Sequence, residues 1–191
     1  MRFMPTTTWS CTLLLALSLA WIGQQAGAQA LDNTGDNSTQ HALSENEALE
    51  LAQQMYVAYY GRPADPAGQK YWAARFELSP NLDQALDAFG ASDEYEASFG
   101  DLASGELVNN LYQQQFGRDA EPDGLAFYAG RLDSGAATLA TIAKQIADGA
   151  QDDDLLALNN KVSVASYFTE QVQLSGSVYT ASDIVALQLV L

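Results

Sequence analysis

The sequence contains one segment twice, and this duplication constrains the fold more than any other feature. Residues 56–76 read YVAYYGRPADPAGQKYWAARF, and residues 112–132 read YQQQFGRDAEPDGLAFYAGRL. The two segments align without a gap and are identical at eight positions. A repeated segment of this kind is typical of one supersecondary unit that is used twice. We therefore predict two repeats, at about 45–100 and about 104–150.

The repeats share a motif of turn-forming, aromatic and basic residues. The motif consists of Gly61, Arg62, Asp65, Pro66, Gly68, Trp72 and Arg75 in the first repeat, and of Gly117, Arg118, Glu121, Pro122, Gly124, Tyr128 and Arg131 in the second. After Arg2, the sequence contains no arginine outside these two motifs. This distribution indicates that each repeat needs a guanidinium at the same two places.

Local signals around the first motif predict helices separated by short turns. Ser44 and Glu47 form a capping box at a helix start. Apolar residues at helical spacing follow as far as Gly61, which can adopt the left-handed conformation that ends a helix. Asp65 then precedes Pro66 as a cap before a proline in the first helical turn, where no backbone donor is lost.

The rest of the chain carries signals of the same kind. We expect helix starts at Ser79-Pro80, Ser104, Glu121-Pro122, Thr138, Asp152 and Thr180, helix ends at Gly117, Ser134-Gly135 and Gly149, and a short helical turn at Ser92–Phe99. No segment shows the apolar–polar alternation of a strand. The predicted fold class is all-α: a helical domain built from a duplicated helix-turn-helix unit plus C-terminal helices.

The beginning of the chain has the pattern of an export signal. Arg2 is followed by an apolar run from Cys11 to Ile22, which is too short to span a bilayer comfortably, and Ala28-Gln29-Ala30 is a small-x-small cleavage site. An uncleaved membrane anchor is the alternative. We expect a signal peptide at 1–30, a flexible leader at 31–43, and an all-helical domain at 44–191 that ends in a helical extension, 152–191.

The charge of the chain is strongly acidic. Cleavage after Ala30 would remove Arg2 and the only cysteine, which leaves 7 Lys+Arg (8 minus 1) against 24 Asp+Glu and a formal charge of −17. Such a surface repels nucleic acid and anionic lipid headgroups. We therefore expect no nucleic-acid partner, and no apolar stretch after the signal is long enough to span a membrane.

The block from Leu111 to Tyr128, LYQQQFGRDAEPDGLAFY, resembles a bacterial family described as domain of unknown function 4214. The first copy, Met55–Trp72, is similar to it as well, and phycobilisome linker domains look like more distant relatives. The resemblance covers about 45–154. It implies an exported or surface-associated protein, often found with calcium-binding repeats or surface-layer proteins, and it supplies no catalytic residue.

One part of the second motif imitates a calcium-binding loop. Asp119, Glu121 and Asp123 alternate ahead of Gly124, as oxygen ligands do in the first half of such a loop. The bidentate acid that completes the pattern is missing, because Gly130 stands at its place. Capping of the next helix by Glu121 explains the same residues without an ion, and we expect no cofactor.

The motif arginines and aromatic residues each have two interpretations. Arg62 and Arg118 either bind terminal carbonyls or the capping acids Asp65 and Glu121, or recognise a carboxylate or phosphate ligand. Tyr71 and Arg75 are four residues apart and are expected to stack. Trp72 and Tyr128 are either core residues or a platform on which a sugar stacks.

Catalytic patterns are largely absent from the sequence. The only histidine, His41, lies in the leader, so a Ser-His-Asp arrangement is not expected, and the chain has no glycine-rich phosphate loop. The sequence therefore favours an exported, non-enzymatic interaction or assembly module at the cell envelope or outside the cell, with a protein partner or self-association. A carbohydrate- or calcium-dependent binding domain is the alternative, and an unrecognised hydrolase is the third interpretation.

Overall fold

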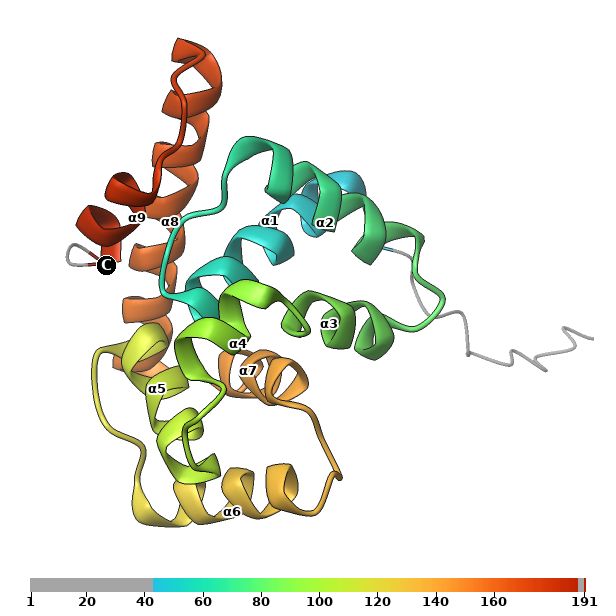
Figure 1. The fold of residues 1–191 in the computed structure, drawn as a ribbon, viewed down its shortest axis with the longest axis vertical. Helices are drawn as coiled ribbons and strands as arrows, with labels where there is room; N and C mark the ends of the chain where they lie inside the picture. Colours follow the sequence, from blue (N-terminus) through green and yellow to red (C-terminus); the bar gives the residue numbers. More distant parts are fainter. Residues whose placement is uncertain (1–42, 189–190) are drawn as a thin grey trace, which may run out of the picture. The chain divides into compact units, whose positions relative to one another are not determined.

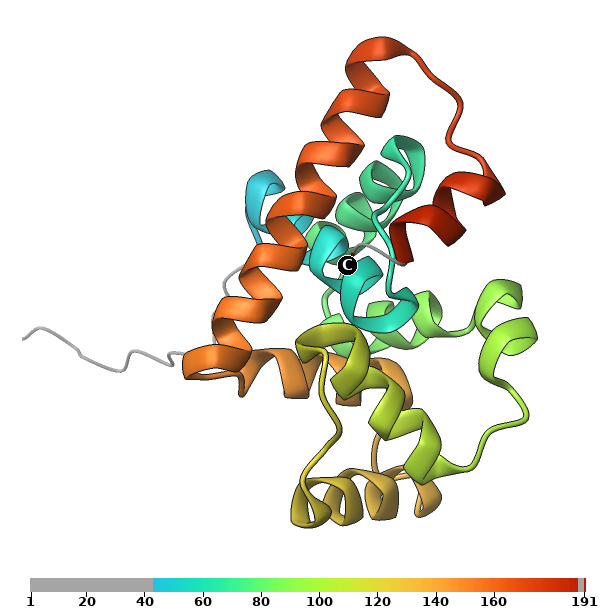
Figure 2. The same ribbon diagram turned by 90° about the vertical axis from the view of Figure 1, so that its left-hand side faces the viewer.

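The computed structural model describes residues 43–188 and residue 191, which belong to one compact unit of the chain. Every regular element of this part is helical, and Figures 1 and 2 show the helices from two directions. The all-α prediction is confirmed. The expected signal peptide and nearly all of the expected leader lie outside the described residues.

The first helix begins at the predicted capping box and ends at the predicted glycine. Helix α1 spans Glu45–Met55 and continues directly into a π-helix, η1, at Tyr56–Tyr60. The side chain of Ser44 accepts from the Glu47 backbone, and the Glu47 side chain accepts from the Ser44 backbone. Gly61 follows in the left-handed conformation, with a φ of 63°. The sequence predicted these ends but not the change to π geometry.

The π-helix ends against a side chain from the second repeat. With its amide nitrogen turned towards them, Gln114 donates to the carbonyl oxygens of Ala58 at 2.9 Å and Tyr59 at 3.1 Å. Carbonyls at a helix end have no partner within the helix and need one elsewhere. Gln114 therefore supplies hydrogen bonds that the last turn of η1 lacks.

The first repeat continues with three more helices. Helix α2 spans Pro66–Leu78 and is capped by Asp65, as predicted. Helix α3 spans Leu82–Gly90, and the short helix α4 spans Asp93–Phe99. The predicted start of α3 at Ser79-Pro80 is wrong: Asn81 caps the helix, because its side chain accepts from the Asp83 backbone while the Ser79 hydroxyl donates to the Asn81 carbonyl.

Three helices without a π-helical segment form the part of the chain that contains the second motif. Helix α5 spans Ser104–Phe116 and ends at Gly117 with a φ of 73°, and α6 spans Pro122–Asp133. Helix α7 spans Leu139–Asp148 and is capped by the Thr138 hydroxyl, as predicted. Glu121 stands at the residue before α6, as predicted, but the prediction that its side chain caps the helix is wrong. Its carboxylate pairs with an arginine instead.

Two C-terminal helices complete the described chain. Helix α8 spans Asp152–Ser175 and begins with the three predicted acids, and α9 spans Ala181–Gln188. Figures 1 and 2 show α8 beside α1 and α5, which it contacts. Thr169 fixes this position, because its hydroxyl lies 2.7 Å from the Ala64 carbonyl and 3.1 Å from the Gln53 amide oxygen.

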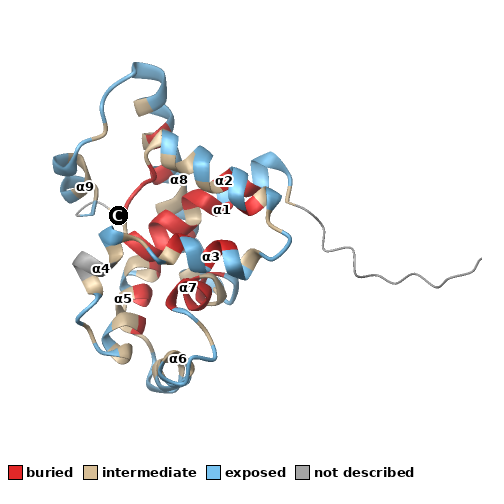
Figure 3. Ribbon diagram, turned by 45° about the vertical axis from the view of Figure 1, so that its right-hand side comes forward, coloured by how far each residue is buried: buried red, intermediate tan, exposed pale blue. Residues whose placement is uncertain are grey.

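One hydrophobic core serves both repeats. Helix α1 packs on α2, α5 packs on α6, and α3 packs on α7. Figure 3 shows the buried residues gathered along α1, α3, α5 and α7. The largest fully buried apolar side chains are Met55, Val57, Phe76, Leu86, Phe89, Val108, Leu111, Ile142 and Leu158. Because the core crosses from one repeat to the other, neither repeat buries its apolar face alone.

Candidate functional site

Arg62 is the most deeply buried charged residue among the described ones. Its Nε and Nη2 donate to the two carboxylate oxygens of Glu94, each at 2.7 Å, and its Nη1 donates to the Pro63 carbonyl at 3.0 Å. Paired planar contacts of this type are the strongest form of ion pair that side chains make. They join the loop after η1 to the first turn of α4.

Three tyrosine rings surround the same guanidinium. Its central carbon lies 4.9 Å from the ring centre of Tyr56, 5.5 Å from that of Tyr60 and 5.9 Å from that of Tyr179. Burial would lower the pKa of Arg62, but hydrogen bonding and ionic attraction to Glu94 outweigh it and raise the pKa above its ordinary value. Arg62 is therefore permanently charged and enclosed.

Arg118 repeats this arrangement in the second motif. Its Nε and Nη2 donate to the Asp154 carboxylate at 2.8 Å and 2.5 Å, and its Nη1 donates to the Asp119 carbonyl at 3.0 Å. Glu121 lies 2.6 Å from the same nitrogen. The side chain of Arg118 is 36% exposed, against 7% for Arg62. The second site is thus a more open version of the first.

The structure corrects the predicted partners of these arginines. Glu121 does pair with Arg118, as predicted. Asp65 does not pair with Arg62, because its carboxylate caps the Gly68 backbone at 2.7 Å. The main partners, Glu94 and Asp154, were missed, since they lie 32 and 36 residues after their arginines. The signal that could have indicated them is their place in the first turn of the next helix: Glu94 in the helix after α3, and Asp154 in the helix after α7.

A groove opens beside Arg62. It has a volume of about 540 Å³ and lies between the start of α2, the end of α8 and α9. Asp65 and Pro66 of the motif line it, together with Tyr179 from the segment before α9. Because the Arg62 guanidinium already binds Glu94 with both of its forked nitrogens, its geometry fits a structural role better than ligand capture.

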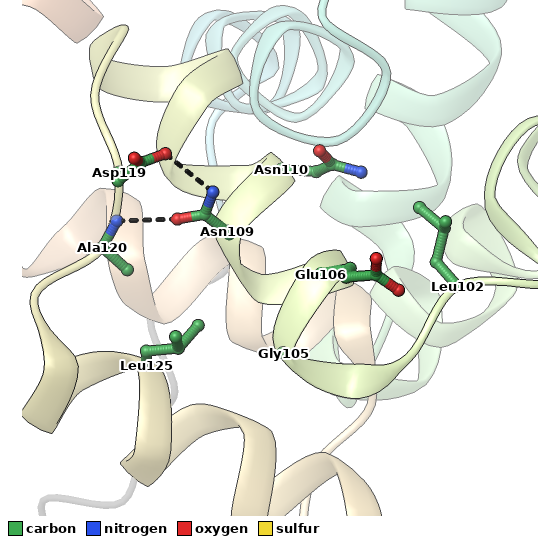
Figure 4. Close-up of a pocket in the computed structure, with 8 residues that line it drawn as sticks. All are labelled: Leu102, Gly105, Glu106, Asn109, Asn110, Asp119, Ala120 and Leu125. Carbon is green, nitrogen blue, oxygen red and sulfur yellow. Dashed lines mark hydrogen bonds between the residues drawn. The ribbon is translucent and has the colours of Figure 1, made fainter.

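The candidate calcium ligands do not converge. Figure 4 shows Asp119 at the edge of a groove of about 570 Å³, with its carboxylate turned towards Asn109. Asp119 accepts from the amides of Asn109 at 2.8 Å and Gln113 at 2.7 Å, and both hydrogen bonds lower its pKa. Glu121 is paired with Arg118. Among residues 43–188 and 191, no three metal-binding side chains form a group.

The same groove contains two carboxylates, which bears on a hydrolytic role. Glu106 accepts from the Ala103 backbone at 3.0 Å, and Asp119 is held by the two amides. A carboxylic acid that donates a proton in glycoside cleavage needs a raised pKa, whereas that of Asp119 is lowered. The arrangement does not favour acid catalysis at this groove.

The predicted sugar platform is only partly accessible. Trp72 and Tyr128 are half-buried and pack against the core. The exposed rings belong to their neighbours Tyr71 and Phe127, which are 55% and 58% exposed. The predicted stacking of Tyr71 with Arg75 is confirmed, with the guanidinium carbon 5.2 Å from the ring centre.

The longest helix carries four large apolar side chains on a side that no other described element covers. Leu156, Val164, Tyr167 and Leu174 of α8 are between 46% and 72% exposed. They are 8, 3 and 7 residues apart, so they lie on one side of the helix. The buried residues Leu158, Ala165 and Thr169 occupy the opposite side. Within the described residues, no helix is long and apolar enough to cross a membrane.

These features define an all-α domain in which two equivalent arginine motifs fasten neighbouring helices. Residues 86–151 match the model of a family described as Domain of unknown function (DUF4214). The predicted resemblance is therefore confirmed over a segment that runs from within α3 to the residue before α8 and contains the second motif. Comparisons with curated proteins and with solved structures gave no match.

Proposed function

We propose that this protein is an exported, non-enzymatic interaction module that binds a protein partner through the outward face of α8. The observation that carries the proposal is the exposed apolar stripe of Leu156, Val164, Tyr167 and Leu174. Large apolar side chains that gather on one exposed face are typical of interaction sites. The export part of the proposal rests on the signal-like sequence of residues 1–30.

The charge distribution supports the same face. Between residues 155 and 182 the sequence contains one acid, Glu170, and one base, Lys161, although the whole chain has 24 acids. Lys161 is not free to meet a partner, because its Nζ donates to the carbonyls of Gln113 at 3.3 Å and Gln114 at 2.8 Å. The centres of protein interfaces are poor in charge, and this part of α8 carries few charged residues, with Tyr167 as an exposed aromatic ring.

Charge placed on the face tests the proposal. We expect Tyr167→Glu and Leu174→Glu to weaken partner binding by at least about tenfold, because each buries a carboxylate at the interface. Ser166→Glu is the matched control, since this exposed residue of α8 lies outside the stripe. Tagged full-length chain is captured from envelope extracts, with calcium and with chelator, and its retained partner is quantified.

Two further measurements distinguish a loss of binding at this face from a loss of the folded structure. Circular dichroism and urea unfolding are expected to match the parent for all three variants, because the side chains are exposed. Sedimentation of the purified chain shows whether the partner is a second copy. Equal retention of one partner by all three variants would contradict the assignment of this face, and the absence of any stoichiometric partner or self-association would contradict the function.

A further inference from the structure

A second surface, formed by α2 and α3, has a different chemical character. A groove of about 600 Å³ is lined there by Tyr71, Arg75, Leu78 and Gln84, among others. Tyr71, Arg75 and Leu78 are spaced by four and three residues, so they share one face of α2. All three are exposed. The groove thus combines an aromatic ring, an aliphatic side chain and a guanidinium.

Arg75 differs from the equivalent arginine of the second repeat. Arg131 is half-buried and donates to the Gln145 side chain at 2.7 Å. Counting from the helix caps Asn81 and Thr138, the residue of α3 that corresponds to Gln145 is Ala88. Alanine offers no acceptor, and no ion pair joins Arg75 to an acid in the described part of the chain. The contact that occupies Arg131 is therefore missing at Arg75.

The free guanidinium is nevertheless held in place. Its Nη1 donates to the Tyr71 hydroxyl at 3.0 Å, and its central carbon lies 5.2 Å from the ring centre of Tyr71 and 5.4 Å from that of Trp72. Only one of its five N–H groups is used in this way. An arginine that is already ordered by aromatic rings loses less conformational entropy when it binds a ligand.

We propose that this groove binds a carboxylate-bearing sugar, namely a uronate unit of an acidic glycan. The guanidinium fork of Arg75 matches the geometry of a carboxylate. The exposed ring of Tyr71 offers a flat apolar surface to the C–H face of the sugar, and the amide of Gln84, which makes no hydrogen bond to another described residue, offers a partner for ring hydroxyls. A uronate carries the carboxylate and the flat face on one rigid ring.

A protein carboxylate fits the groove less well. The carboxylate of Asp or Glu sits on a flexible stem and brings no rigid flat face to Tyr71. The net charge of −16 also disfavours general attraction of polyanions, so binding has to arise from local contacts in the groove. The site therefore differs in chemistry and in position from the stripe of apolar side chains on α8.

Calorimetry with the purified full chain tests this site. The probes are tri-galacturonate, tri-mannuronate and tri-guluronate, the methyl ester of whichever binds most tightly, and a tri-glutamate peptide. We expect saturable binding of at least one uronate, with the ester and the peptide weaker by about tenfold or more, as expected for loss of a charge-assisted hydrogen bond or of the ring contact. Arg75→Gln is expected to weaken the uronate by a similar factor.

Arg131→Gln is the matched control, because it removes the same group from the equivalent position of the second repeat and is expected to leave uronate affinity unchanged. Since Arg75 is exposed, Arg75→Gln is expected to unfold like the parent in urea. The proposal is overturned if none of the three uronates binds saturably, if Arg75→Gln binds as the parent does, or if the ester or the glutamate peptide binds as tightly as the uronate.

Discussion

Gly68 and Gly124 occupy the same place in the two motifs, at the third residue of α2 and α6. Each lies close to the hydroxyl of the buried tyrosine that begins its copy of the duplicated segment, Tyr56 or Tyr112. A Cβ built on Gly68 would lie 2.5 Å from the Tyr56 hydroxyl, and one on Gly124 would lie 3.1 Å from that of Tyr112. At this scale the glycine is explained by close approach of a tyrosine hydroxyl at both positions, and at Gly68 also of the Asp65 carboxylate, whose oxygen would lie 2.6 Å from the same Cβ.

We expect Gly68→Ala to lower the free energy of unfolding by about 1–2 kcal/mol, because overpacking outweighs the better helix propensity of alanine. Gly124→Ala is expected to change it by less than about 1 kcal/mol. Gly105→Ala is the control, since a Cβ there meets nothing within 4 Å in α5. Urea unfolding of the three variants measures the order. A loss at Gly105 equal to that at Gly68 would show that the close contacts at Gly68 are not the cause.

At the scale of elements, one arginine of each motif holds the start of a later helix in place. Arg62 binds Glu94 at the start of α4, and Arg118 binds Asp154 at the start of α8. The two acids therefore occupy equivalent places, although α4 has 7 residues and α8 has 24. Both arginine contacts therefore reach residues outside the aligned segments 56–76 and 112–132.

We expect Arg62→Ala to cost about 3 kcal/mol of unfolding free energy and Arg118→Ala about 1 kcal/mol. The difference follows from the burial of the arginine itself, because removal of Arg62 takes a hydrogen-bonded guanidinium out of a site enclosed by three tyrosine rings, whereas Arg118 is one-third exposed. Lysine at either position keeps the charge and loses the fork, so it is expected to restore part of the loss. Equal losses in denaturant unfolding, or lysine variants equal to the parent, would refute this account of the two sites.

At the scale of the whole molecule, short-range signals predicted most of the fold. The capping boxes at Ser44 and Thr180 and the glycines 61 and 117 stand where the helices begin and end. These ends depend on neighbouring residues, so the sequence carries them directly. The π-helix was not predictable in this way, because its last carbonyls are satisfied by Gln114 from the other repeat.

The candidate sites depended on contacts that are distant in sequence, and the predictions were correspondingly incomplete. Glu94 and Asp154 are ordinary acids in a chain that has 24 of them. Their importance appears only when the helices are placed. The same holds for Trp72, whose exposure depends on how α2 packs on α1, and for Arg75, whose free guanidinium is evident only beside the occupied Arg131.

The net charge of −16 makes the pH dependence of stability a balance of two opposite effects. Protonating acids as the pH falls relieves repulsion across the molecule, which stabilises the fold. It also removes local ion pairs, which destabilises it. The hydrogen bonds from Arg118 lower the pKa of Asp154 in the folded state. The stabilisation from this pair is therefore complete above the unfolded pKa of about 3.9 and is lost as the pH falls through the folded pKa.

A difference measurement isolates this pair from the general repulsion. We expect the unfolding free energy of the parent to exceed that of Asp154→Asn by about 1 kcal/mol near pH 7, and the gap to shrink as the pH falls below the unfolded pKa of about 3.9 and through the lowered folded pKa. Asp153→Asn removes the same charge from an exposed neighbour in the same first turn of α8 that makes no ion pair with Arg118 in the described structure, so its difference from the parent reports the general repulsion and the helix N-terminus, which both acids share. Urea unfolding from about pH 7 to about pH 2.5 gives all three curves. A gap for Asp154→Asn that stays constant with pH, or that matches the Asp153→Asn curve, would show that the Arg118 pair does not hold α8 in place.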